Sequence, residues 1–119
     1  MVCFCKDNID TPQNQNGLIV LLYDSAIEYM RQAIKALEGN NIYEEKDNYI
    51  YKAQYIINEL NEVLDMKTGG KLAINLRRLY CFMNNQLTQA NIECEPQMIH
   101  EVSTLMEKLS KKWKSIASP

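Results

Sequence analysis

Apolar residues recur at intervals of three and four along nearly the whole chain, and the alternation typical of β-strands is almost absent. Segments containing Gly, Asn or Pro interrupt this pattern. It predicts α-helices over residues 16–38, 42–65, 71–91 and 96–115. Short connections force neighbouring helices to run antiparallel, so we expect an all-α, up-down-up-down four-helix bundle. Residues 1–15 fit no helical pattern, and we expect a mobile N-terminal arm there.

Each predicted helix carries an apolar stripe, which we assign to the core of the bundle. The stripe of the first helix is the widest, so we expect that helix at the centre. The stripes of the other three are, in order, Tyr49, Ala53, Ile56, Leu60 and Val63; Leu72, Leu76, Leu79, Met83, Leu87 and Ala90; and Met98, Val102, Leu105, Leu109, Trp113 and Ile116.

Apolar residues outside these stripes predict a surface that binds a partner. Some lie beside the stripe of the second helix, and others point away from the stripes of the second and third helices. The candidate partner-binding residues are Ile50, Tyr51, Tyr55, Ile57, Leu64, Ile74, Tyr80 and Cys81. Surplus apolar surface of this kind suits an amphipathic helix of another protein. It also leaves open a weak homodimer, or an irregular bundle with scattered exposed apolar residues.

Length and charge narrow the class of protein. A chain of 119 residues has room for one domain with one core. The net charge of −2, with acids and bases spread along the chain, argues against a nucleic-acid partner. We find no signal peptide and no apolar run near the roughly 20 residues that a membrane span requires. We therefore expect a cytoplasmic protein with no membrane insertion.

The residues that carry most enzyme chemistry are missing from the sequence. Its four glycines form no phosphate-binding loop, so we expect no nucleotide cofactor and no enzyme activity. A di-iron carboxylate bundle needs two Glu-x-x-His pairs, but Gln97 lies three residues before the only histidine. Cys3 and Cys5 have no second pair of ligands with which to bind zinc, so we expect no metal and free thiols.

One alternative uses that histidine. Phosphorelay transfer domains are also four-helix bundles with a single exposed histidine, and the helical angle predicts that His100 is exposed. In such a domain the sequence that starts at the phosphorylated histidine resembles His-x-x-Lys-Gly. Here Ser103 and Thr104 occupy the third and fourth positions after His100. No cation is placed to hold a phosphoryl group, which favours an ordinary surface histidine. A generic helical adaptor is a second alternative.

Five segments, in the right order and spacing, resemble motifs of the flagellar export chaperone family FliS. They read LIVLLYDSAI at 18–27, KAQYIINEL at 52–60, LDMKTGG at 64–70, NLRRLYCFM at 75–83 and LTQANI at 87–92. The first is similar to the family's L-I-x-M-L-Y-D-G-A-I, with Ser25 in place of glycine. The resemblance extends over about residues 18–113.

The resemblance implies a function as well as a fold. A chaperone of this bacterial family holds the disordered C-terminal segment of flagellin as short amphipathic helices along its bundle. That contact prevents premature polymerisation of flagellin and keeps it ready for type III export. The resemblance also implies docking at the cytoplasmic part of the flagellar export gate. The expected partners are therefore flagellin and an export gate protein.

Overall fold

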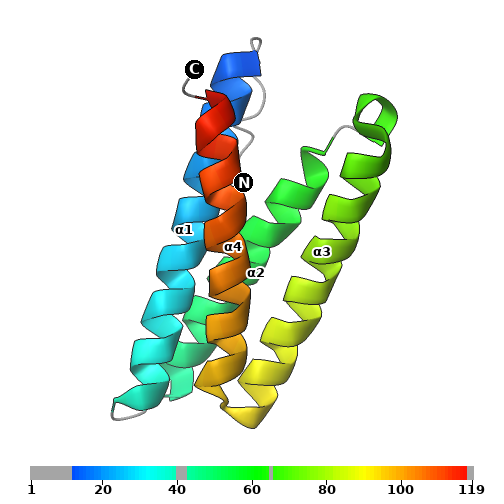
Figure 1. The fold of residues 1–119 in the computed structure, drawn as a ribbon. Helices are drawn as coiled ribbons and strands as arrows, with labels where there is room; N and C mark the ends of the chain where they lie inside the picture. The colour runs from blue at the N-terminus through cyan, green and yellow to red at the C-terminus, as the bar shows by residue number, and fades with distance from the viewer. Residues whose placement is uncertain (1–11, 40–42, 65, 118–119) are drawn as a thin grey trace.

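The computed structural model describes residues 12–39, 43–64 and 66–117. These residues form four helices and no strand: α1 (Pro12–Glu38), α2 (Tyr43–Glu62), α3 (Met66–Glu93) and α4 (Pro96–Ala117). In Figure 1 the chain reverses direction from each helix to the next. The prediction of an all-α four-helix fold is confirmed.

The first helix begins earlier than predicted. Helix α1 starts at Pro12, so residues 12–15, which we expected in the arm, are helical. Proline suits this position because the first amide of a helix has no partner within the helix and the proline φ angle is already helical. The rest of the predicted arm, with Cys3 and Cys5, lies outside the described residues.

Two glycines shape the beginning of α3. Gly70 has φ 55° and ψ −132°, which is not helical, so the regular part of α3 begins at Lys71 as predicted. A positive φ angle favours glycine because a Cβ atom would strain it. Gly69 is needed for space, since a Cβ atom there would lie 2.7 Å from the Cβ of Ala73. The GG pair therefore lets the chain turn tightly into α3.

The connection between α3 and α4 is a compact helix cap. Cys94 takes φ 53°, the left-handed conformation that usually ends a helix at glycine or asparagine. The amide of Glu95 then donates to the carbonyl of Ala90 at 3.1 Å, the six-to-one bond of a Schellman motif. Pro96 opens α4, as predicted from its preference for the first helical position.

The core lies where the four helices face one another. Helix α1 packs on α2 and α4 most extensively, and α3 packs on the same two helices less extensively. Figure 1 shows α3 diverging from α4 toward the end of the bundle where α3 begins. The largest fully buried side chains are Tyr23, Met30, Ile50, Ile57, Leu60, Met83, Leu87, Ile99, Val102 and Met106.

The predicted stripes are correct in part, but the buried face of three helices is rotated from them. Val63, the last expected member of the stripe of the second helix, lies just beyond the end of α2 and is exposed. On α3 the buried face includes Ala73 and Tyr80, while Leu72 is 62% exposed. On α4, Ile99 and Met106 are buried, and the predicted Met98 and Leu105 are only partly buried.

Candidate partner-binding site

The structure divides the eight predicted binding residues into two groups. Tyr51, Tyr55 and Ile74 are exposed by 58%, 49% and 42%, and Cys81 is also exposed. Leu64 is partly buried at the edge of the core. These five residues have surface that a partner can contact.

The other three predicted residues belong to the core. Ile50 and Ile57 have no exposed surface, and Tyr80 is 2% exposed. The expectation that Ile50 and Ile57 lie beside the core was therefore wrong. They are seven residues apart and share one side of α2, and that side faces the bundle interior. A partner could reach them only if the helices moved apart.

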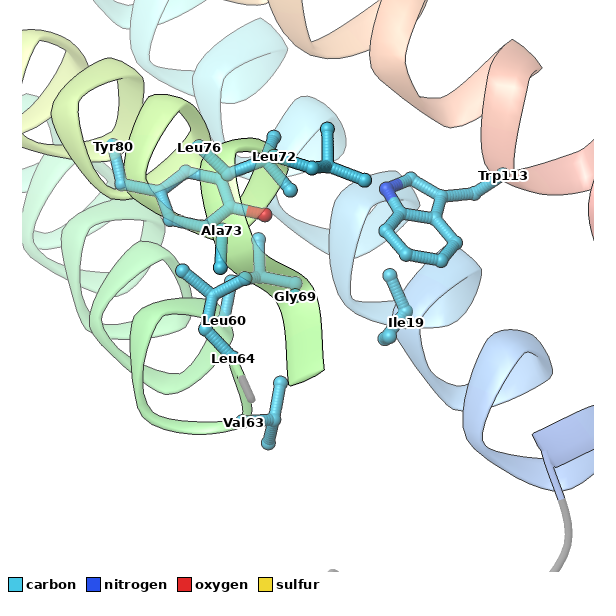
Figure 2. Close-up of a pocket in the computed structure, with 10 residues that line it drawn as sticks. All are labelled: Ile19, Leu60, Val63, Leu64, Gly69, Leu72, Ala73, Leu76, Tyr80 and Trp113. Carbon is cyan, nitrogen blue, oxygen red and sulfur yellow. The ribbon is translucent and has the colours of Figure 1, made fainter. Parts of the chain in front are cut away.

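An apolar cavity opens at the end of the bundle where α3 begins (Figure 2). Its volume is about 200 Å³, and side chains from all four helices line it. We name it the α2–α3 cavity, because eight of its ten lining residues come from α2, α3 and the turn between them. It is lined by Ile19, Leu60, Val63, Leu64, Gly69, Leu72, Ala73, Leu76, Tyr80 and Trp113.

Sequence reasoning found only part of this cavity. Leu64 and Tyr80 were predicted as binding residues, whereas Val63, Leu72 and Trp113 were assigned to the core stripes. Figure 2 shows Trp113 and Ile19 across the cavity from the α3 side chains. Trp113 is the only tryptophan of the chain, and tryptophan is enriched at binding sites, so its presence could have indicated a binding residue on the last helix.

A polar cluster lies at the base of the α2–α3 cavity. The hydroxyl oxygens of Tyr23 and Tyr80 are 2.5 Å apart, and the indole N–H of Trp113 donates to the Tyr23 hydroxyl at 3.2 Å. Burial raises the pKa of Tyr80 above its ordinary value, and the neighbouring Tyr23 raises it further. Burial also raises the pKa of Tyr23, although its hydrogen bonds with Tyr80 and Trp113 act in the opposite direction.

A second apolar surface, which we name the tyrosine shelf, lies on α1 and α2. It consists of Tyr29, Tyr51, Lys52, Tyr55 and Ile56. The ring of Tyr29 stacks on that of Tyr49, with centroids 6.4 Å apart. The ammonium of Lys52 lies 5.6 Å from the Tyr29 centroid, within the range of a cation–π interaction. The two exposed tyrosines predicted from the sequence therefore lie on one surface.

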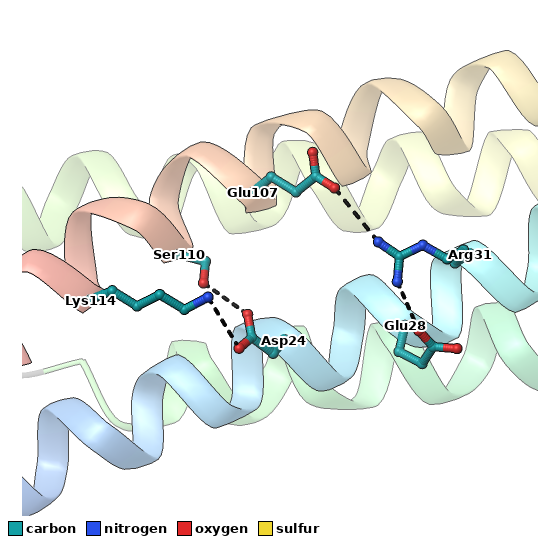
Figure 3. Close-up of polar contacts among 6 residues, drawn as sticks. All are labelled: Asp24, Glu28, Arg31, Glu107, Ser110 and Lys114. Carbon is teal, nitrogen blue, oxygen red and sulfur yellow. Dashed lines mark hydrogen bonds and ion pairs between the residues drawn. The ribbon is translucent and has the colours of Figure 1, made fainter.

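The interface of α1 with α4 is polar along its outer edge (Figure 3). The Ser110 hydroxyl donates to Asp24 at 2.9 Å, and the Lys114 ammonium lies 3.5 Å from the same carboxylate. Farther along, Arg31 lies 3.8 Å from Glu107. The charged side chains of these pairs are about half exposed, so each ion pair contributes little to stability. They mark this edge as a solvated surface.

A buried lysine joins the beginning of α2 to the end of α3. Lys46 is 5% exposed, and its ammonium donates to the carbonyl of Asn91 at 3.0 Å. It also lies 3.1 Å from Asp47 and 3.6 Å from Cys94 Sγ. Burial by itself lowers the pKa of Lys46, but Asp47 and Cys94 outweigh it, so the pKa lies above its ordinary value.

The described residues offer little that would support catalysis. His100 is exposed on α4, as predicted. Within the described ranges no group of three or more His, Cys, Asp or Glu side chains could hold a metal ion. Among the described helices, none combines the length and the apolar character that a membrane span needs.

Comparison with known proteins identifies the family. The sequence matches the family described as flagellar protein FliS over residues 6–119. The chain belongs to the FliS family. This confirms the resemblance seen in the five sequence motifs, and it confirms that the chain is not an enzyme, because FliS proteins are chaperones.

Individual FliS relatives match most of this chain. It is 39% identical to flagellar secretion chaperone FliSB of Pseudomonas aeruginosa, over 87% of this chain and 82% of the relative. It is 37% identical to flagellar secretion chaperone FliS of Vibrio cholerae, over 83% and 72%. The FliS of Salmonella typhimurium is 33% identical, over 84% and 74%. The family therefore supports a role in flagellar export for this chain.

Proposed function

We propose that this FliS protein binds the C-terminal segment of flagellin as short amphipathic helices, prevents its premature polymerisation and delivers it to the flagellar type III export gate. It would do so in the bacterial cytoplasm, where flagellin is made. The observation that carries the proposal is the α2–α3 cavity, an apolar site at the surface of a protein whose relatives are named flagellar secretion chaperones.

Exposed apolar side chains extend the surface beyond that cavity. Leu21 is 61% exposed and Phe82 is 48% exposed. Side chains of this size are costly to leave in water, and burying one against a partner contributes roughly 1.5–3 kcal/mol before ordering costs. A few such anchors would offset the entropy lost when a disordered cargo segment folds on the chaperone.

The dimensions of the bundle favour a cargo segment in several pieces. A continuous helix of about 40 residues would be about 60 Å long. The described helices extend 44 Å along their longest axis, so one straight helix of that length would reach beyond them. Short helices on more than one face would fit, and the α2–α3 cavity and the tyrosine shelf offer two separate apolar faces.

The exposed apolar faces also affect whether the chaperone self-associates when no cargo is bound. Without cargo, exposed apolar faces would favour weak self-association, which cargo would then compete away. The proposal therefore includes a weak homodimer whose dissociation accompanies flagellin binding. Sedimentation of the free protein and of its mixture with cargo distinguishes this homodimer from a monomer.

The function is tested with flagellin encoded in the same genome. Purified chaperone is mixed with full-length unfolded flagellin, or with flagellin that lacks its last 40 or so residues, and complexes are separated by gel filtration. We expect a stable complex with the full-length protein and none with the truncated one. Equal complex formation by both flagellins would place the binding segment elsewhere, and no complex with either would refute the function.

A further inference from the structure

The three polar groups at the base of the α2–α3 cavity carry one hydrogen more than they can share among themselves. Tyr23, Tyr80 and Trp113 each supply one donor hydrogen. Within the described residues they form two hydrogen bonds, from Trp113 to Tyr23 and between the two tyrosines. Whichever tyrosine donates in the second bond, one hydroxyl hydrogen is left without an acceptor among the described residues.

Contact with the cavity decides which hydroxyl keeps that hydrogen. Tyr23 has no exposed surface and does not line the cavity, so an unpaired donor there would carry the full desolvation cost. Tyr80 does line the cavity, and in Figure 2 its hydroxyl points toward the space between α3 and Trp113. In the favoured arrangement Trp113 donates to Tyr23, Tyr23 donates to Tyr80, and Tyr80 offers its hydrogen to the cavity.

The size and the lining of the cavity define which ligand group can accept the Tyr80 hydroxyl hydrogen. A cavity of about 150 Å³ binds benzene in another protein. The cavity of about 200 Å³ here therefore has room for an aromatic ring or a leucine-sized group, and for a few atoms in addition. Apart from the Tyr80 hydroxyl and the Trp113 indole, the lining side chains are aliphatic. A ligand hydroxyl would again leave one hydrogen unpaired, whereas a carbonyl oxygen accepts without donating.

We propose that the α2–α3 cavity binds one bulky apolar group of the cargo together with a carbonyl oxygen that accepts the Tyr80 hydroxyl hydrogen. The source of this group rests on the function proposed above. The last turn of a cargo helix presents both features, because its final four carbonyls have no partner within the helix. The cavity thus selects a helix end, rather than any apolar side chain.

Two small molecules of nearly equal size test the hydrogen bond. Acetophenone carries a carbonyl and ethylbenzene does not, so the ratio of their dissociation constants isolates the acceptor. Each is titrated into the full chain, and NMR signals of Leu64, Leu72 and the Trp113 indole are followed. We expect the preference for acetophenone to fall about fivefold in Tyr80→Phe, which corresponds to one hydrogen bond.

Two further variants control for location and folding. Tyr51→Phe removes a hydroxyl from the tyrosine shelf and should leave the ratio unchanged, because Tyr51 does not line this cavity. Leu72→Asn changes an exposed lining residue and should weaken both molecules. An equal ratio in wild type and Tyr80→Phe would overturn the hydrogen bond. Absence of shifts at the cavity signals would overturn the cavity as a binding site.

A peptide of the flagellin C-terminal segment then separates this proposal from the proposed function. We expect the peptide to displace acetophenone from the cavity. If the peptide binds and acetophenone stays, the cavity is not the cargo subsite, but the chaperone function stands. If the peptide does not bind while the acetophenone preference still depends on Tyr80, the chemistry of the cavity stands and the flagellin function fails.

Discussion

The indole nitrogen of Trp113 lies 3.2 Å from the hydroxyl oxygen of Tyr23, 90 residues earlier in the chain. The contact joins the last helix to the first. Trp113 also forms a wall of the α2–α3 cavity, so one side chain both closes the bundle and shapes the surface proposed to receive cargo. Stability and binding are therefore expected to respond together when this residue changes.

Replacing Trp113 with phenylalanine should lower the free energy of unfolding by about 1–2 kcal/mol, since it removes the donor to Tyr23 and retains an aromatic ring. Urea unfolding followed by circular dichroism measures the change. Tyr51→Phe, which alters an exposed aromatic side chain, is the control and should change stability little. An unchanged midpoint for Trp113→Phe would show that the hydrogen bond does not stabilise the bundle.

Tyr23 and Tyr80 should make the protein unstable at high pH. Both have a pKa above the ordinary 10.0 in the folded state, so above pH 10 the unfolded chain releases protons that the folded chain retains. The stability contributed by the two buried hydroxyls is fully present below pH 10 and is lost as pH rises; for Tyr80 the loss is about 1 kcal/mol over the first unit above 10.

Unfolding at pH 9 and pH 11 measures this loss, and Tyr80→Phe should show a smaller loss than wild type. Absorbance near 295 nm provides an independent measurement, because burial raises the pKa of Tyr80 and delays its ionisation to higher pH. Ionisation of Tyr80 in the folded protein near pH 10 would contradict the buried pair.

The core and the surface are distinguished by the same substitution at two isoleucines. Ile57 has no exposed surface, so Ile57→Ala should cost about 2–5 kcal/mol of stability through lost packing and a cavity. Ile74 is 42% exposed, and Ile74→Ala should cost about 1 kcal/mol or less. Thermal melting compares the two variants. Equal losses would show that Ile74 is also part of the core.

Two lysines on α2 provide a similar comparison for polar contacts. Lys46→Met keeps the apolar stem but removes the donor to the Asn91 carbonyl, and should cost about 1–3 kcal/mol. Lys52→Met alters an exposed ammonium over tyrosine rings and should cost about 1 kcal/mol or less. Chemical unfolding of both variants tests this ranking, which would be refuted if Lys52→Met were the more damaging change.

The helical fold followed from the sequence because period and turn chemistry agree along most of the chain. Gly70 marks the start of the regular part of α3, where a positive φ angle favours glycine, and Pro96 opens α4, where the proline φ angle is already helical. The start of α1 was missed because residues 12–15 are polar. These four residues extend α1 toward the N-terminus from the predicted start at residue 16, and they carry no apolar pattern of their own.

The candidate site was harder to predict than the fold. On α2 the apolar face is wide enough that Tyr49 and Ile50 fit the core equally well by spacing, and packing on α1 and α3 decides in favour of Ile50. Leu72 has a regular place in its stripe, yet it lies at the open end where α3 diverges. Burial there depends on the distance between helices, which no single helix encodes.

The most direct measurement of the central claim is calorimetric titration of the full chain with a peptide of the last 40 or so residues of flagellin, repeated at several temperatures. We expect binding at micromolar concentrations or below, with a negative heat-capacity change from the burial of apolar surface. Leu72→Asn should weaken binding without unfolding the protein, because Leu72 is 62% exposed. No heat of binding at micromolar concentrations, in a protein that melts cooperatively, would contradict the account.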